Sequence, residues 1–111
     1  MFFADYEAEA AQTAVYPDAG TASDSALAYV VLGLTGEAGE VANKVKKILR
    51  GDGFSWENRD ALISELGDVL WYVAALAREL QVPLDNVARI NLRKLEARAD
   101  NGTIKGNGDN R

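Results

Sequence analysis

The sequence predicts an all-α protein, a bundle of four helices. Apolar residues recur at intervals of three and four along four segments, and no stretch has the strict alternation of a β-strand. The only two prolines, Pro17 and Pro83, fall where one helix would end and another would begin. A chain of 111 residues can build one domain with a modest core. We therefore expect a single domain over residues 1–101 and a tail rich in glycine and asparagine over residues 102–111.

The first two helices are expected on either side of a polar loop. The first helix covers residues 3–15 and stops at Pro17. Ser23 or Asp24 can accept hydrogen bonds from the first N–H groups of the second helix and so cap it. This helix runs to Arg50 and ends at the Gly-Asp-Gly sequence that follows.

The last two helices complete the bundle. Ser55 is the expected cap of the third, which covers about residues 56–80. Pro83 opens the fourth, because its fixed φ suits a first helical turn, and that helix extends to about Ala99.

The composition excludes several classes of function. The formal net charge of −5 and the pI near 4.6 argue against a nucleic-acid partner, which needs a basic surface. The longest apolar run, residues 69–77, is about half the ~20 residues needed to span a bilayer, so we expect no membrane segment. The start, MFFADYEAEA, is not a secretion signal, and we expect a cytoplasmic protein. The chain has no cysteine and no histidine, so its chemistry must use carboxylates, lysine, tyrosine or a hard metal ion.

Each of the two long helices carries two carboxylates at spacing i, i+3 beside its apolar stripe. These residues are Glu37 and Glu40 on one helix and Glu65 and Asp68 on the other. If the helices pack antiparallel, the four carboxylates converge, and such a cluster requires protons or cations to neutralise it. Oxygen ligands without histidine or cysteine favour Mg²⁺ or Mn²⁺ over zinc, and a Mg²⁺ ion held this way expects phosphate oxygens among its other ligands.

The same carboxylates also have a plainer interpretation as solvated helix surface. Glu40 and Lys44 stand at i, i+4 in the favourable order, and such a pair contributes ~0.2–0.5 kcal/mol. Two acidic pairs on successive helices, the second running directly into the apolar VLWYVAALA, favour the metal site.

The helix expected to begin at Pro83 has polar groups on its apolar side. Asn91, Lys94 and Arg98 project close to the direction of its leucines and valine. They indicate that this side faces something anionic inside the bundle. Alternatively, the long side chains bury only their stems and keep their charged ends in water.

Four glycines interrupt the two long helices next to the carboxylates: Gly33, Gly36, Gly39 and Gly67. Each costs ~1 kcal/mol relative to alanine inside a helix. Either they allow a second helix or a ligand to come close, or they are tolerated helix-packing positions.

The third helix is apolar on all sides over residues 69–77. Four helices in a chain of this size can hardly surround it, so we expect a homo-oligomer. Trp71 is expected to point away from the stripe that packs within the chain, where it would be either an interface anchor or a stacking surface for a nucleobase.

These motifs resemble those of the MazG-like nucleotide pyrophosphohydrolases, in the all-α NTP pyrophosphatase superfamily. The resemblance covers residues 26–98 and rests on GLTGEAGEVANKVKK and the later ELGDVLWYVAALARELQVPLDNVARINLRKLEAR. It implies a MazG fold, in some relatives dimeric or tetrameric, and a Mg²⁺ site formed by Glu37, Glu40, Glu65 and Asp68. The implied reaction cleaves a nucleoside triphosphate between its α and β phosphates, giving the monophosphate and pyrophosphate.

The resemblance also implies roles for other side chains. One of Glu37 or Glu40 would deprotonate the attacking water. The family's lysine after the first motif matches Lys44 or Lys47, and its Asn-x-x-Lys element matches Asn91 and Lys94; with Arg98, these residues would bind the phosphates. The C-terminal GTIKGNGDNR resembles one branch of short MazG-like proteins, in which the tail would fold over the site.

Two other functions remain open on the sequence. A helical regulatory module could bind metal and nucleotide without turnover. A purely structural bundle would have the carboxylates as solvated charge.

Overall fold

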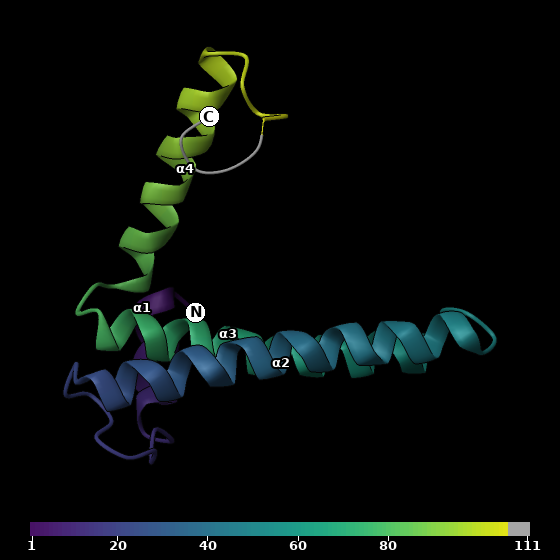
Figure 1. Cartoon of the computed structure of the whole chain (residues 1–111), viewed down its shortest axis with the longest axis horizontal. Coiled ribbons are helices and arrows are strands. Elements are labelled where there is room, and N and C mark those ends of the chain that lie inside the picture. The colour runs from purple at the N-terminus through teal and green to yellow at the C-terminus, as the bar shows by residue number, and fades with distance from the viewer. Residues whose placement is uncertain (107–111) are drawn as a thin grey trace.

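The computed structural model describes residues 1–106, and these contain four α-helices and no strand. The helices are α1 (Phe3–Ala11), α2 (Asp24–Arg50), α3 (Trp56–Glu79) and α4 (Leu84–Asp100) (Figure 1). The predicted all-α class and the number of helices are confirmed. Residues 102–106 form turns, and the rest of the predicted tail lies outside the described residues.

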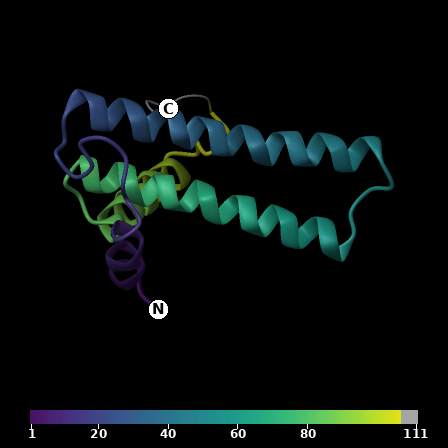
Figure 2. The same ribbon diagram turned by 90° about the horizontal axis from the view of Figure 1, so that it is seen from below.

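The long helices α2 and α3 lie side by side as an antiparallel hairpin (Figure 2). Both begin at the predicted caps: the Ser23 hydroxyl accepts a hydrogen bond from the Ala26 N–H and the Ser55 hydroxyl from the Asn58 N–H, each at 3.2 Å. At the other end of α2, Gly53 adopts φ 85° and donates its N–H to the Ile48 carbonyl. Only glycine takes such a φ without strain, which explains how the chain reverses here.

Helix α1 is shorter than predicted, because it ends at Ala11 rather than near Val15. The Thr13 hydroxyl donates a hydrogen bond to the Ala10 carbonyl and accepts one from the Trp71 indole N–H, each at 2.8 Å. Such a side-chain bond to the backbone competes with the helical pattern, and the indole holds the chain against α3. The predicted ends of the third and fourth helices differ from the observed ones by one residue, which is within the usual scatter of helix boundaries.

A buried carboxylate fixes the loop between α1 and α2. Glu79 at the end of α3 is 1% exposed and accepts hydrogen bonds from the Tyr16 hydroxyl, the Gly20 N–H at 2.7 Å and the Ala22 N–H at 2.9 Å. Burial alone would raise the pKa of Glu79, but these hydrogen bonds and the charge of Arg78 outweigh it and lower the pKa. Burial, followed by the bond to Glu79, raises the pKa of Tyr16 to about 12. The sequence alone predicts no role for Glu79.

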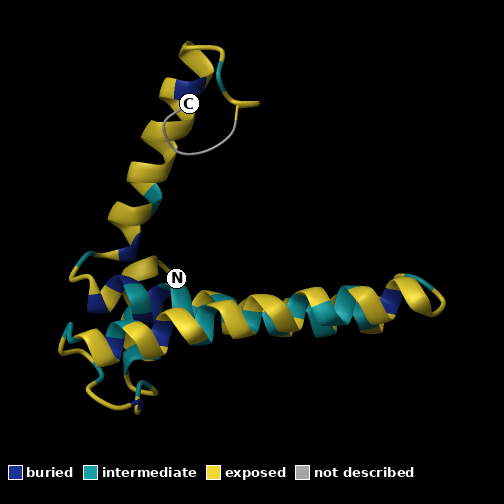
Figure 3. Ribbon diagram, viewed as in Figure 1, coloured by how far each residue is buried: buried dark blue, intermediate teal, exposed yellow. Residues whose placement is uncertain are grey.

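The core is small and lies at one end of the hairpin. One cluster joins the loop to α2 and α3, and its buried members are Tyr16, Ala26, Val30 and Ala75. A second cluster joins α3 to α4, and its buried members are Ala74, Ala77 and Leu84. Much of the apolar surface of α2 and α3 beyond this core stays open to solvent (Figure 3), for example Leu66 of α3, which is 61% exposed.

Helix α4 leaves the hairpin instead of packing along it (Figure 1). Among the described residues it contacts α1 and α3 but not α2. The Glu7 carboxylate accepts a hydrogen bond from the Leu84 N–H at 3.1 Å and so ties the start of α4 to α1. The radius of gyration is 16.6 Å, against the ~13 Å expected for a compact domain of this length. One copy of the chain is therefore more open than a closed bundle.

No helix within residues 1–106 is long and apolar enough to cross a membrane.

Candidate metal and nucleotide site

Three carboxylates from the two sides of the hairpin lie together. Glu37 of α2 and Glu65 and Asp68 of α3 each offer one oxygen, and these oxygens all lie within 4.8 Å of one another. Glu37 and Glu65 are half-buried and Asp68 is exposed. The i, i+3 spacing puts the two α3 carboxylates on one side of their helix, where α2 runs past them. We call Glu37, Glu65 and Asp68 the carboxylate cluster.

The fourth predicted ligand, Glu40, lies one turn beyond Glu37 on α2 and is exposed. It does not belong to the cluster. Its charge nevertheless reaches Glu37: burial, and then the charges of Asp68, Glu65 and Glu40, raise the pKa of Glu37. The cluster thus combines partial burial with mutual repulsion, and a cation would relieve the repulsion.

Lys44 extends the cluster toward the tip of the hairpin. Its Nζ lies 3.6 Å from an oxygen of Glu65, so it pairs across the hairpin rather than with Glu40 on its own helix. Lys44 and Lys47 both line a cavity of about 480 Å³ at the tip, together with the Gly51–Ser55 turn and Asn58. The sequence predicted both lysines as phosphate ligands, and the structure places them at one cavity that begins beside the cluster.

Aromatic side chains adjoin the cluster in the other direction along α3. Tyr72 follows Asp68 by one turn, and its ring lies directly on α2 at Gly33: a Cβ added to Gly33 would come within 2.1 Å of the Tyr72 Cε1. Burial, then Tyr29 and the charge of Glu37, raise the pKa of Tyr72. Gly33 therefore allows the Tyr72 ring of α3 to come close to α2. For this glycine, the interpretation that the helix glycines permit close approach of a second helix is confirmed. Added Cβ atoms at Gly36, Gly39 and Gly67 would meet nothing within 4 Å.

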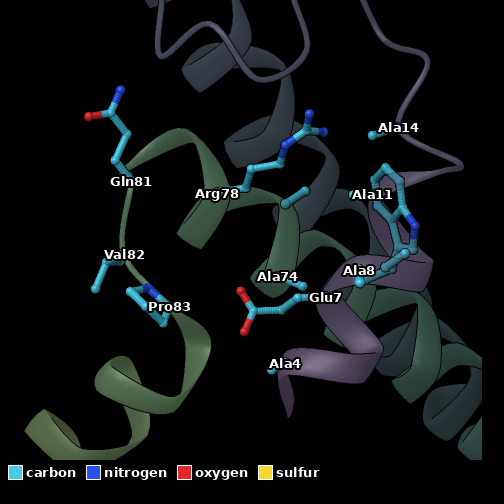
Figure 4. A pocket seen from close by; sticks show the side chains of 13 residues that line it. Ala4, Glu7, Ala8, Ala11, Ala14, Ala74, Arg78, Gln81, Val82 and Pro83 are labelled. Atoms are coloured by element: carbon cyan, nitrogen blue, oxygen red, sulfur yellow. The ribbon is translucent and has the colours of Figure 1, made fainter. Parts of the chain in front are cut away.

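Trp71 packs within the chain, so the prediction that it points away from the chain's own core is wrong. Its ring meets Tyr72 edge-on with centroids 4.9 Å apart and Tyr16 at 6.3 Å, and Tyr16 in turn stacks on Tyr29. The loop that Glu79 anchors supplies the contact with Tyr16, and the helical periodicity of α3 gives no signal for it. Trp71 also lines a cavity of about 530 Å³ between α1 and the end of α3, walled mainly by alanines, with Glu7 and Arg78 among the side chains around it (Figure 4).

The predicted phosphate-binding residues of α4 lie apart from the cluster within one chain. Asn91 and Lys94 are exposed and Arg98 is buried. The expectation that this side of the helix faces the interior of a bundle is therefore wrong for Asn91 and Lys94 in the single chain. The reason is the direction of α4, which diverges from the hairpin after Leu84 (Figure 1).

Comparison with known proteins places the chain in a family. The model of the MazG nucleotide pyrophosphohydrolase domain matches residues 26–103, more than half of the chain. The chain is also 58% identical over 109 residues to the protein called "Gene 37 protein" of Mycobacterium phage L5, and the match covers 96% of each chain. No solved structure matches significantly. The fold and site are those of an all-α protein with carboxylates across a helical hairpin, and the chain belongs to the MazG nucleotide pyrophosphohydrolase family.

Proposed function

We propose that this protein is a Mg²⁺-dependent nucleoside triphosphate pyrophosphohydrolase. It would convert ribo- or deoxynucleoside triphosphates to the monophosphate and pyrophosphate, and so control or clean the nucleotide pool. The observation that carries the proposal is the carboxylate cluster, held across the hairpin of a MazG domain and bordered by Lys44. Such a substrate is found in the cytoplasm, which is the location we propose.

The cluster fits a hard cation. It offers carboxylate oxygens from both helices, and the raised pKa of Glu37 reflects repulsion that a divalent ion would remove. Magnesium prefers oxygen ligands, needs only a few carboxylates when phosphate oxygens complete its coordination, and can be replaced by Mn²⁺. We propose Glu37, Glu65 and Asp68 as ligands, with Glu40 joining them when its side chain turns toward the ion. When bound, the ion would polarise phosphate oxygens and make an attacking water more acidic.

Side chains of the protein would then accept the proton from the water and stabilise the leaving phosphates. Glu37 or Glu40 would take a proton from the water as its oxygen attacks the α phosphorus. The bond between the α phosphorus and the bridging oxygen breaks, and pyrophosphate leaves with that oxygen. Lys44 and Lys47, at the hairpin-tip cavity, would stabilise the charge on the leaving phosphates. Glu40 is the better candidate for the base, since it lies outside the cluster and its carboxylate is less constrained.

We also propose that the working form is a homo-oligomer, a dimer or a tetramer. The support is the exposed apolar surface along the hairpin and α4, for example Leu32 at 72% and Leu92 at 64% exposed. Apolar surface of this extent normally marks an interaction site.

The alternative is a regulatory module that binds metal and nucleotide without turnover. The variant Glu40→Gln separates the two, because it removes the proposed base and leaves the cluster intact. An enzyme loses hydrolysis and keeps nucleotide binding, whereas a sensor has no hydrolysis to lose. The activity itself is tested by incubating the protein with a panel of nucleoside triphosphates, with and without Mg²⁺, and measuring both products.

A further inference from the structure

The tip of the α2–α3 hairpin contains more space than the proposed reaction uses. Its cavity of about 480 Å³ lies within the range of ~300–1,000 Å³ that is typical of binding sites for small organic molecules. A leaving pyrophosphate is a small anion without apolar surface, and Lys44 and Lys47 suffice to bind it. The cavity therefore has room for a larger leaving group.

The wall of this cavity combines three kinds of side chain. Two lysines make it cationic, three apolar side chains line another part of it, and one side chain is an amide; these residues are Lys44 and Lys47, Ile48, Phe54 and Ala61, and Asn58. The Asn58 side-chain nitrogen donates a hydrogen bond to the Gly53 carbonyl at 3.0 Å, and within residues 1–106 nothing donates to its side-chain oxygen. The cations suit phosphates, whereas apolar surface with one free acceptor suits a heterocyclic base that carries an amino group.

Phe54 offers an aromatic face at this cavity. Its side chain is 65% exposed, and no aromatic ring or cation stacks on it within the described part of the chain. Trp56 is 77% exposed but lines only a neighbouring cavity, and the Arg59 guanidinium lies over its ring, 5.5 Å from the ring centre. A free aromatic face can stack on any nucleobase, because every base has a π-face. Phe54 is therefore the aromatic ring at the hairpin tip that is available to hold a base.

The distance from the carboxylate cluster to Phe54 suits a long phosphate chain. The Lys44 Nζ lies 3.6 Å from an oxygen of Glu65 in the cluster, so the cationic part of the cavity begins there. Ser55, directly after Phe54, caps α3 ten residues before Glu65, which is ~15 Å along the helix at a rise of ~1.5 Å per residue. A phosphate chain bound at the cluster can run past both lysines and end in a second nucleoside beside Phe54.

We infer that the site also hydrolyses dinucleoside polyphosphates, in which a chain of several phosphates joins two nucleosides. The inference rests on the proposed function, because the same kind of bond breaks. Water attacks the α phosphorus of the nucleotide at the cluster, its proton passes to the glutamate base, and its oxygen stays on the nucleoside monophosphate. The bond from the α phosphorus to the bridging oxygen breaks, and a second nucleoside polyphosphate leaves with that oxygen. Phe54 stacks on the base of this leaving group, while Lys44 and Lys47 bind its phosphates.

Initial rates with three substrates and Mg²⁺ test the inference. The substrates are a dinucleoside tetraphosphate, the matching nucleoside triphosphate and a dinucleotide joined by only two phosphates. We expect the tetraphosphate to give nucleoside monophosphate and nucleoside triphosphate, with a kcat/KM at least equal to that of the triphosphate. The dinucleotide with two phosphates is too short to reach Phe54 from the cluster, so its kcat/KM should be at least ~10-fold below that of the tetraphosphate.

Three variants assign the effect to one aromatic ring. In Phe54→Ala, the loss of base stacking should lower the kcat/KM for the tetraphosphate, relative to that for the triphosphate, at least ~10-fold. Phe54→Tyr keeps the ring and should keep this ratio. Trp56→Ala is the matched control, because this ring is also exposed at the hairpin tip but lines only the neighbouring cavity; it too should keep the ratio.

The outcomes separate the inference from the proposed function. If the wild type hydrolyses the triphosphate but not the tetraphosphate, or forms two nucleoside diphosphates from the tetraphosphate, the inference is wrong and the proposed function stands. The same conclusion follows if Phe54→Ala and Trp56→Ala change the ratio equally. If the wild type hydrolyses none of the three substrates, the proposed function is wrong and the inference fails with it.

Discussion

Gly33 is the position at which one methyl group should have the largest effect. In the variant Gly33→Ala, the new Cβ would lie 2.1 Å from Cε1 and 2.3 Å from Cζ of Tyr72. Carbon atoms in contact prefer separations of ~3.5–4.0 Å, so the ring must move. It would leave its edge-on contact with Trp71.

The expected magnitude follows from two opposing contributions. Overpacking of this severity costs up to ~3 kcal/mol. Alanine in place of glycine stabilises a helix interior by ~1 kcal/mol. We therefore expect Gly33→Ala to lower the free energy of unfolding by about 2 kcal/mol, which corresponds to a fall in Tm of roughly 8 °C.

A double-mutant cycle with Tyr72→Ala isolates the clash. Without the ring, Gly33→Ala should be stabilising by ~1 kcal/mol, so the coupling between the two positions is about 3 kcal/mol. The assay is thermal and urea unfolding of the four proteins at one concentration, followed by circular dichroism. If Gly33→Ala is equally destabilising with and without the tyrosine ring, the reasoning from close helix approach is wrong.

Three further predictions concern the charged groups. Glu79→Ala should lower the free energy of unfolding by ~3 kcal/mol, because it leaves the Tyr16 hydroxyl and two backbone N–H groups without their acceptor. Thermal unfolding measures this change, and a value below ~1 kcal/mol would contradict the prediction. Because the pKa of Glu37 is raised, protons compete with Mg²⁺ for its carboxylate at pH values above the ordinary glutamate pKa. The rise in Tm caused by Mg²⁺ should therefore be full at high pH and should disappear as the pH falls through the raised pKa. A Mg²⁺-induced rise in Tm that grows toward acid pH would refute the assignment of Glu37 as a ligand. Lys44→Met should change the free energy of unfolding by less than ~1 kcal/mol, since the ion pair with Glu65 is partly exposed. The same variant should slow hydrolysis at least ~10-fold. Thermal unfolding and steady-state rates of the variant and the wild type test both effects, and an unchanged rate would show that Lys44 does not belong to the site.

Local signals in the sequence were enough to predict most of the helices. Ser23 and Ser55 were predictable as the caps of α2 and α3, because each hydroxyl accepts a hydrogen bond from a backbone N–H only three residues later in the sequence. The i, i+3 spacing on two adjacent antiparallel helices also predicted that carboxylates of both helices converge, and this is confirmed for Glu37, Glu65 and Asp68 but not for Glu40, which lies outside the cluster.

Features that depend on distant partners were not predictable in this way. The early end of α1 depends on a hydrogen bond between Thr13 and Trp71, which are 58 residues apart in the sequence. Glu79 looks like an ordinary solvated residue at a helix end, because the three donors that bury it come from a loop about sixty residues earlier. The direction of α4 follows from the turn before it, where Gln81 adopts φ 59°, an unusual value for a residue other than glycine. Composition gives no signal for that angle.

The central claim is a single reaction, so product identity tests it most directly. Purified protein is incubated with ribo- and deoxynucleoside triphosphates, with and without Mg²⁺, beside the Glu37→Gln variant, and the products are separated by ion-exchange chromatography. We predict equal amounts of nucleoside monophosphate and pyrophosphate, formed only with Mg²⁺ and only by the wild type. Release of nucleoside diphosphate and phosphate, or no product from folded protein with Mg²⁺ across the whole panel, would contradict the assignment.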